Sequence, residues 1–388
     1  YSLVANNREF FSLLTRWIWG NVLGRPTWNL TRRFFLIGIG LVYLIAFSSF
    51  GSQIEGLIGK EGILPAQSLL QEVEVKMGPE RFWKLPTLFW LEASDGFIKF
   101  ICFAGVAVSL LVMAGIMPAF GLFMLWLFYL SLFNVGQQFL GFQWDTLLLE
   151  TGFLAIFLAP LKWRPKLATE PPPSPWVLLL LRFLLFRLIF TSGWVKLASG
   201  DLTWNDHSAL LYYYETQPLP TWIGWYAHQL PQGFQEYSVI AVLIIQLGVP
   251  FFIFGPGRIR YAAATILIFF QLLISLTGNY CFFNILTISL CFLLFDDSLL
   301  KKVVPEKWRI TFKETRSRIQ EWKKWFVLGV GQGVLAISIL LYFIPLFISS
   351  VSYPPIFISM VNKIGPFHIV NQYGLFAVMT TSRPEIFI

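Results

Sequence analysis

Lys196 is the residue whose setting most favours chemistry. It closes an apolar run that ends in Thr-Ser-Gly-Trp-Val-Lys at 191–196, where Gly193 lets a neighbouring backbone come close. A lysine half-buried among aromatic rings can lose its proton near neutral pH, which is the condition for a general base or an amine nucleophile. The alternative, which the spacing favours, is that the amine snorkels to a membrane surface and does no chemistry.

Residues 212–231 combine polar and aromatic side chains. Pro218 and Pro220 break any helix there, so the polar side chains must hydrogen-bond or face water. One interpretation is a wet, aromatic-rimmed cleft in which Glu215 and His228 assist Lys196. Its candidate binding residues are Asp201, Trp204, Tyr212, Tyr214 and Gln217. The other interpretation, equally supported, is a rigid interfacial loop; its anchors would be Trp222, Trp225 and Tyr226.

Four further charged residues lie within apolar runs, where an unpaired charge costs several kcal/mol. These candidates for intramembrane ion pairs are Asp145, Glu150, Arg182 and Arg187. A helical rise places Arg187 roughly 13 Å from Lys196 and Glu150 roughly 7 Å from Asp145. An Arg187–Glu150 pair is therefore feasible if the two helices are neighbours. The favoured interpretation is that these charges fix the register of packed helices.

The usual catalytic signatures are absent. The sequence contains no HExxH, GxSxG or phosphate-binding loop, and its three histidines are widely scattered. The three cysteines fall in apolar runs, which predicts small core residues rather than a disulfide framework. No metal site is therefore predicted, and any cofactor is left unknown.

The elements that must position these residues are membrane-spanning helices. Of 388 residues, 56% are hydrophobic, 18% aromatic and 13% charged, with a mean hydropathy of +0.64. This excess of apolar side chains excludes an ordinary soluble enzyme and a disordered chain. Apolar runs bounded by charge, Pro or Gly predict about nine spans, near 34–50, 97–113, 118–135, 146–161, 177–195, 238–254, 260–276, 280–295 and 327–348.

We therefore expect an all-α polytopic bundle with interfacial helices and long outer loops. The membrane domain is predicted at 34–348, between an N-terminal segment at 1–33 and the start of an outer C-terminal region at 349–388. The segments that connect the spans must lie alternately on the two sides of the membrane. Those on the side of the N-terminal segment carry, together with that segment, 19 Lys and Arg residues, and those on the opposite side carry 7. This bias predicts a cytoplasmic N-terminus.

The net charge of +8 predicts contact with anionic lipids rather than nucleic acid, because the basic residues lie beside apolar runs. On the cytoplasmic side, residues 305–326 predict an amphipathic helix that would bind lipid headgroups. On the outer side, 51–96 and 196–237 are rich in carboxylates. Within the first, Leu69, Leu70, Val73 and Met77 share one face of a predicted short helix on the membrane, interpreted as a lid without chemistry.

Several long motifs resemble the lipase maturation factor family. They are Phe-Gln-Trp-Asp-Thr-Leu-Leu-Leu-Glu-Thr-Gly at 142–152, Gly-Asp-Leu-Thr-Trp at 200–204, Tyr-Glu-Thr-Gln-Pro-Leu-Pro at 214–220, Gly-Asn-Tyr-Cys-Phe-Phe-Asn at 278–284 and Ile-Val-Asn-Gln-Tyr-Gly-Leu-Phe-Ala-Val-Met-Thr-Thr-Ser-Arg-Pro-Glu-Ile at 369–386. The resemblance implies a multi-spanning protein of the animal endoplasmic reticulum that secreted lipases need to become active, with bacterial relatives. It also implies a soluble outer domain after the last motif.

The membrane part also resembles the HTTM group, which includes the vitamin K-dependent gamma-carboxylase. Ser192, Gly193, Lys196 and Leu197 match the setting of the basic lysine in that enzyme. This second resemblance implies only that Lys196 could act as a base toward a quinone-like substrate.

Two functions follow from these resemblances. The preferred prediction is a membrane helper of lipase folding and maturation, with secreted lipases as clients. The alternative is an HTTM-type membrane enzyme that acts on a lipid or quinone-like substrate with Lys196 as general base. The one glycosylation acceptor, Asn29, falls on the predicted cytoplasmic side, so the outer loops carry none. This favours a bacterial inner membrane over the endoplasmic reticulum, and both compartments stay open.

Overall fold

The computed structural model describes residues 27–166, 170–303, 321–348 and 352–384, and within these ranges it contains helices and no strand. The predicted all-α class is therefore confirmed. Seven helices have the length and composition to cross a membrane, and they comprise Asn29–Gly51, Asp95–Ala114, Pro118–Val135, Pro175–Ala198, Gln232–Phe254, Gly257–Thr277 and Val327–Leu346. The other two predicted spans are the shorter helices α8 (Gln143–Leu158) and α15 (Phe283–Phe292). The chain is a multi-pass integral membrane protein.

The helices form two compact units. Unit 1 comprises Tyr1–Thr31, Arg182–Arg309 and Tyr373–Ile388, and unit 2 comprises Arg32–Leu181 and Ile310–Gln372. Two long helices, α2 (Asn29–Gly51) and α9 (Pro175–Ala198), contain residues of both. The predicted amphipathic helix at 305–326 lies mostly outside the described residues.

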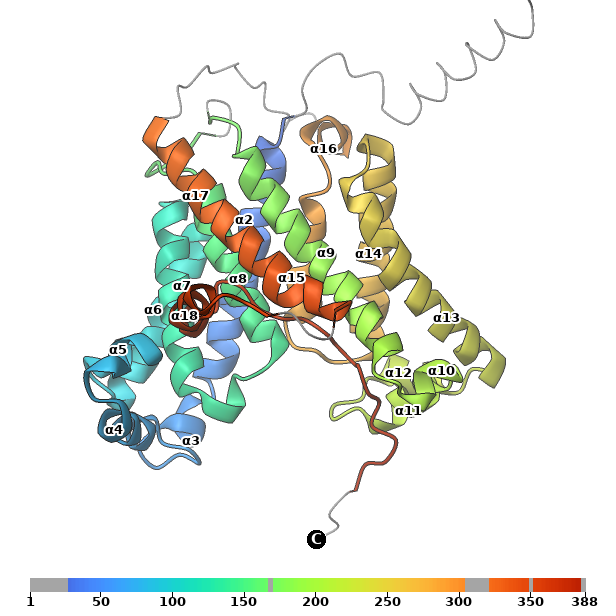
Figure 1. Cartoon of the computed structure of the whole chain (residues 1–388), viewed down its shortest axis with the longest axis horizontal. Helices are drawn as coiled ribbons and strands as arrows, with labels where there is room; N and C mark the ends of the chain where they lie inside the picture. The colour runs from blue at the N-terminus through green and yellow to red at the C-terminus, as the bar shows by residue number, and fades with distance from the viewer. Residues whose placement is uncertain (1–26, 167–169, 304–320, 349–351, 385–388) are drawn as a thin grey trace, which may run out of the picture. The chain divides into compact units, whose positions relative to one another are not determined.

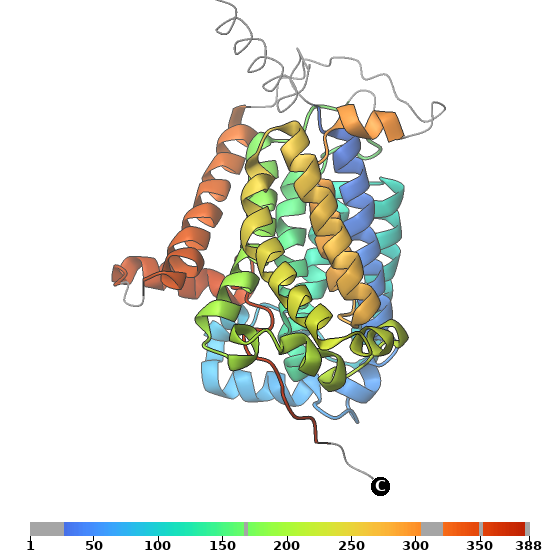
Figure 2. The same ribbon diagram turned by 90° about the vertical axis from the view of Figure 1, so that its right-hand side faces the viewer.

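Unit 2 is built on α2, α6 (Asp95–Ala114), α7 (Pro118–Val135) and α8, which pack side by side in Figures 1 and 2. Small residues let these helices approach closely. A Cβ on Gly152 would lie 2.0 Å from the Tyr43 hydroxyl, and one on Gly105 would lie 2.5 Å from the Phe47 ring. Phe47 and Tyr129 pack edge to face at 5.7 Å, so aromatic side chains fill the space that the glycines leave.

The end of unit 2 that is predicted to lie on the outer side carries short helices. Their bounds are α3 (Ile54–Ile58), α4 (Ala66–Met77), η1 (Gly78–Glu80), α5 (Arg81–Lys84), η2 (Leu88–Trp90), η3 (Gln137–Phe139), α18 (Pro355–Ile364) and η9 (Gly365–Phe367). The short helix predicted after residue 65 is α4, in which Leu70 is buried while Val75 is 87% exposed. Trp83 of α5 donates a hydrogen bond to the carbonyl of Lys363 in α18 at 2.7 Å, which ties the two helices together. A further span of unit 2 is formed by α17 (Glu321–Ile337), η7 (Ser338–Phe343) and η8 (Ile344–Leu346).

Unit 1 is built on the second part of α9 and on α13 (Gln232–Gly248), η5 (Val249–Phe254), α14 (Gly257–Thr277) and α15. Short helices lie at the end where α9 finishes, namely α10 (Leu202–Asn205), α11 (Ala209–Thr216) and α12 (Trp222–His228). α11 ends just before Pro218, and α12 begins just after Pro220, as the helix-breaking prolines predict.

The other end of unit 1 is held by charged side chains. Asp297, the first residue of α16 (Asp297–Val303), accepts backbone hydrogen bonds from Asn29, Leu30 and Thr31 at 2.9–3.1 Å. These are N–H groups that the first turn of α2 leaves without a helical partner, so a carboxylate from a distant helix caps α2.

Candidate functional site

The end of α9 binds an extended segment of the chain, residues 373–384, which we call the C-terminal strap. Figure 1 shows it leaving the end of α9 and running past α11. The Thr191 hydroxyl donates to the Tyr373 carbonyl at 2.8 Å, and the Leu375 amide donates to the Ser192 hydroxyl at 3.3 Å. A Cβ on Gly374 would meet Val195 at 3.2 Å, so the strap backbone lies directly against the helix.

Lys196 is the central contact of this site. Its Nζ donates to the carbonyl of Leu375 in the strap at 2.6 Å and to the carbonyl of Ser192 at 2.9 Å. The amine also lies 4.9 Å from the centre of the Trp204 ring and 5.8 Å from that of Phe376. Only 2% of the residue is exposed, and no carboxylate of the described residues lies within ion-pair distance. Carbonyl oxygens and aromatic faces both attract an ammonium group, so they hold the amine in place without an acidic partner.

Asp201 and Trp204 hold the next part of the strap. The Asp201 carboxylate accepts hydrogen bonds from the amides of Met379 at 2.8 Å and Thr203 at 2.7 Å. Burial raises the pKa of Asp201, but these hydrogen bonds outweigh it and hold the pKa below its usual value. Met379 packs against Trp204, Ala209 and Val239 in a small apolar core. Asp201 therefore anchors the strap and caps α10.

Aromatic rings from α11 and the α14–α15 turn surround Phe376. Its ring packs edge to face against Tyr213 at 5.9 Å and Tyr280 at 5.4 Å, and the Tyr280 hydroxyl donates to the Tyr213 hydroxyl at 2.7 Å. Burial raises the pKa of Tyr280 to about 12 and that of Tyr213 well above its usual value, so both phenols stay protonated. Gln217 donates to the Thr277 carbonyl at 3.0 Å, which joins the end of α11 to the end of α14.

Glu215 and His228 form a separate pair. His228 Nε2 lies 3.1 Å from Glu215 Oε1, and the Glu215 side chain is 63% exposed. The His228 ring packs edge to face near Tyr214, with the ring centres 6.4 Å apart. Neither side chain hydrogen-bonds Lys196. Tyr212 contributes its carbonyl to Thr216 within α11. The structure thus brings Lys196, Asp201 and Trp204 to the strap and leaves Glu215, His228 and Tyr214 in a second cluster.

The charged residues within the helices are placed in both units. In unit 2, Asp145 accepts a hydrogen bond from the Tyr129 hydroxyl at 2.6 Å, and Glu150 accepts one from the Asn371 amide at 2.9 Å. In unit 1, Arg182 donates to the Leu293 carbonyl at 3.0 Å and lies over Trp28, while Arg187 lies 5.6 Å from the Tyr373 ring centre. The predicted Arg187–Glu150 pair stays a prediction.

Sequence reasoning missed the acceptors and donors that the strap supplies. Tyr373, Leu375 and Phe376 of the strap, and Asn371 just before it, lie in the long motif at 369–386, which by itself indicates only a resemblance to a family. The carbonyl that Lys196 binds has no side-chain signal, because every residue has one. Among the described residues, no group of three or more His, Cys, Asp or Glu side chains is placed to bind a metal.

The fold and this site define a polytopic helical membrane protein in which the end of the spanning helix α9 docks a C-terminal strap. The profile of the lipase maturation factor transmembrane domain matches residues 30–302. Lipase maturation factor 2 of Xenopus tropicalis is 43% identical over 69% of this chain and 39% of its own length. Lipase maturation factor 1 of Bos taurus is 32% identical over 94% of this chain and 68% of its own length. The chain belongs to the lipase maturation factor family.

Lipase maturation factor 2 of Homo sapiens is 38% identical over 78% of this chain and 46% of its own length. The chain thus spans less than half the length of the lipase maturation factor 2 relatives. No solved structure matches it.

Proposed function

We propose that this protein assists the maturation of secreted lipases from within a membrane. The observation that carries the proposal is the family match over residues 30–302, which runs from α2 into α16 and covers parts of both units. The relatives are named for lipase maturation, and the matching profile is that of the family's transmembrane domain.

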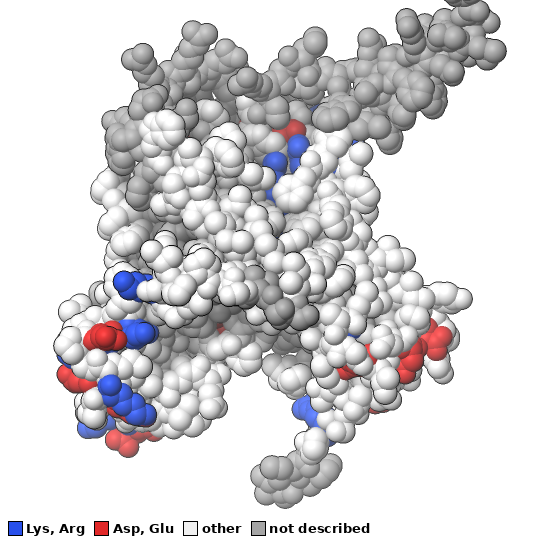
Figure 3. Space-filling model, viewed as in Figure 1, with Lys and Arg blue, Asp and Glu red and all other residues white. Residues whose placement is uncertain are grey.

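The outer end of unit 1 is the surface we propose for lipase clients. α12 exposes an aromatic face, with Trp222 89%, Trp225 60% and Tyr226 68% exposed. Figure 3 shows acidic side chains gathered over the α10–α13 part of unit 1, beside a broad uncharged area. Exposed aromatic side chains bind apolar surface at a small entropic cost, which suits transient contact with an incompletely folded enzyme. The same residues would also serve as interfacial anchors in a membrane.

Secreted lipase activity tests this function. Cells that lack their own lipase maturation factors would express this chain, and lipase activity per mass of secreted lipase would be measured. We expect the chain to raise this ratio and the triple variant Trp222→Ala, Trp225→Ala, Tyr226→Ala to abolish most of the gain. Trp163→Ala is the matched control, because Trp163 is 66% exposed but lies on the predicted cytoplasmic side. An unchanged ratio with normal membrane insertion would count against the proposal.

We propose that Lys196 is a positioning residue that docks the strap. Its two carbonyl contacts and two aromatic neighbours support this role. The alternative role, a general base in an enzyme acting on a lipid or quinone-like substrate, predicts loss of function with unchanged stability when Lys196 is replaced. A docking role predicts that strap attachment, stability and function fall together.

For the compartment, we propose the endoplasmic reticulum membrane, with residues 1–33 cytoplasmic and 349–388 on the luminal side. Secreted lipases fold in that lumen, so the outer ends of both units would face their clients. A bacterial inner membrane would keep the same orientation, with the outer ends in the periplasm. Fractionation of cells that express the native gene distinguishes the two.

A further inference from the structure

A small polar pocket in unit 2 lies where three candidate spans begin or end. It is lined by Arg32, Arg33, Leu36, Ala114, Gly115, Pro118, Pro160, Pro165 and Glu170. Ala114 is the last residue of α6, Pro118 is the first of α7, and the two arginines lie in the first turns of α2. If the three helices cross a bilayer, their ends lie among the lipid headgroups, and so does the pocket.

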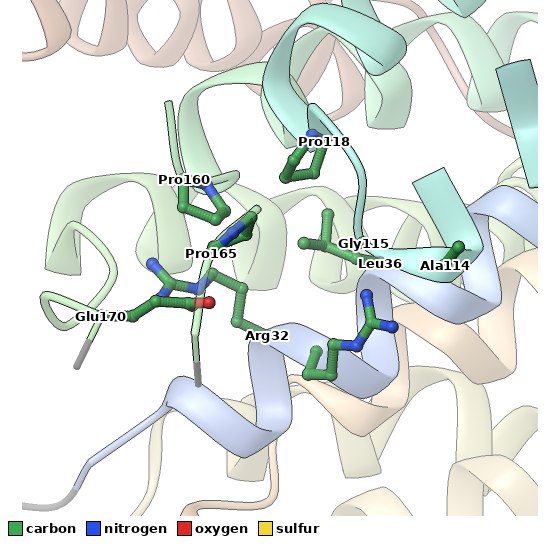
Figure 4. A pocket seen from close by; sticks show the side chains of 9 residues that line it. Arg32, Leu36, Ala114, Gly115, Pro118, Pro160, Pro165 and Glu170 are labelled. Atoms are coloured by element: carbon green, nitrogen blue, oxygen red, sulfur yellow. The ribbon is translucent and has the colours of Figure 1, made fainter. Parts of the chain in front are cut away.

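The charges in the pocket do not cancel. Arg32, which is 3% exposed, forms an ion pair with Glu170 and donates to the Pro171 carbonyl at 3.1 Å, so its charge is compensated. Figure 4 shows the Arg32 and Glu170 side chains facing each other beside Pro165. Arg33 makes one hydrogen bond to the described residues, to the Met113 carbonyl at 2.8 Å, and no ion pair with them.

Two arginines thus share one carboxylate, and the pocket keeps a net positive charge. The half-buried Arg33 is attracted by Glu170 but forms no ion pair with it. A guanidinium has five N–H groups, so four of them remain for a ligand or water. Gly115 makes room for it, because a Cβ there would lie 2.6 Å from Arg33 Nη1. The three prolines offer no backbone N–H, so the arginines are the main donors in the pocket wall. The neighbouring loop adds exposed Lys162 and Arg164.

The pocket size limits the ligand. Its volume is about 110 Å³, which corresponds to about four water molecules at about 30 Å³ each. One phosphate group fits this space. Exposed Leu161 and Trp163 flank the basic loop, and such residues anchor a surface at the membrane interface.

We propose that this pocket binds the phosphate of an anionic lipid headgroup, with Arg33 as the residue that holds its charge. The acyl chains stay in the bilayer, and the basic loop at 162–166 contacts the lipid surface around the site. This inference does not depend on the proposed role in lipase maturation.

Binding of a short-chain lipid to the purified chain tests the proposal. The probes are dihexanoyl phosphatidic acid below its micelle concentration and inorganic phosphate, each titrated in phosphate-free detergent buffer. We expect phosphatidic acid to bind and Arg33→Gln to weaken that binding by at least about tenfold, as expected when a charged hydrogen-bond donor is lost. Arg164→Gln is the matched control, because it removes the same charge from an exposed position outside the pocket; we expect less than about a twofold change.

Two results would overturn the proposal. Equal weakening by Arg33→Gln and Arg164→Gln, or by neither, would mean that the pocket is not the binding site. Inorganic phosphate that binds as tightly as phosphatidic acid and displaces it would mean a site for free phosphate rather than for lipid. If Arg33→Gln fails to fold, Ala114→Leu fills the pocket from an exposed helical position and leaves both arginines intact. Unchanged lipid binding in a folded Ala114→Leu variant would then contradict the proposal.

Discussion

At the scale of single residues, Lys196 shows how a buried cation can be stabilised without a carboxylate. Its amine bridges α9 and the strap through main-chain carbonyls, and Trp204 and Phe376 cover it. A buried charge that is only partly compensated destabilises a protein, whereas one that is hydrogen-bonded and packed on aromatic faces does not. The position of Lys196 therefore depends on the strap, and the strap depends on Lys196.

We expect Lys196→Met to lower the free energy of unfolding by about 1–3 kcal/mol, because it leaves the Leu375 carbonyl without its buried donor. Backbone amides at 375–379 should exchange hydrogen faster in the variant, as measured by mass spectrometry. Lys99→Met is the matched control, since Lys99 pairs with Glu55 at a site where both side chains are about half exposed. A strap that stays fully protected in Lys196→Met would contradict the docking role.

His368 is expected to make the segment before the strap sensitive to pH. Its ring packs on Phe133 with 4.5 Å between ring centres, and burial lowers its pKa below the usual 6.5, although a hydrogen bond with Asn371 opposes this shift. The unfolded chain therefore binds the proton more readily, so stability is lost as the pH falls below about 6.5. Amide protection at residues 369–372, measured as the exchange rate relative to that of an unstructured chain at the same pH, should be lower at pH 5.5 than at pH 7.5.

The His368→Asn variant provides the control for this pH effect. Asn tolerates the left-handed backbone of this position, where φ is 50°. The variant should lose most of the pH dependence of this protection, whereas His228→Asn should keep it. A pH dependence that survives His368→Asn would assign the titration to another group.

At the scale of elements, the close approach of α9 and α13 positions the helix that carries Lys196. A Cβ on Gly193 would lie 2.8 Å from Cβ of Gln246 and 3.1 Å from the Leu247 side chain. The shortest contact is with a Cβ atom, which cannot swing away as the tip of a side chain can, so a larger residue must move the helices apart. The Ser-Gly-x-x-Lys pattern thus has a packing explanation in addition to its chemical one.

Gly193→Ala should lower the thermal midpoint of unfolding, because the added methyl group overpacks the interface at a cost of about 1–3 kcal/mol. Gly233→Ala in α13 is the matched control, since a Cβ there meets nothing within 4 Å. At that open helical position alanine should be neutral or stabilise by up to about 1 kcal/mol. Equal effects of the two variants would show that Gly193 is not a packing requirement.

At the scale of the whole molecule, orientation is the property on which the proposed client surface and lipid site both depend. The bias in Lys and Arg predicts that the 162–166 loop is cytoplasmic and that α4 lies on the outer side. Arg164 in the loop and Lys76 in α4 are both exposed, so each can be replaced by cysteine.

We expect Lys76→Cys, in a chain without its native cysteines, to react with a membrane-impermeant maleimide added to the outer side. Arg164→Cys should react only after the membrane is permeabilised. The readout is the fraction of chain labelled in sealed vesicles of known orientation. The opposite pattern would place the aromatic face of α12 in the cytoplasm, where it could not meet secreted lipases.

Most of the fold could be predicted from local sequence. The apolar runs predicted every long helix, and α4 and the helix break around Pro218 and Pro220 were recognised as well. These features depend on the composition and periodicity of neighbouring residues, which the sequence displays directly. The importance of Lys196 and Trp204 could also be recognised from their residue types.

The groups that these side chains bind could be identified only in the folded chain. Lys196 binds a main-chain carbonyl 179 positions away, Asp201 binds a main-chain amide 178 positions away, and Glu150 binds the amide of Asn371. Main-chain groups are the same in every residue except proline, so no residue type marks the one that will be bound. Burial of a charge within the bilayer is thus foreseeable from sequence, but the backbone segment that compensates it depends on long-range packing.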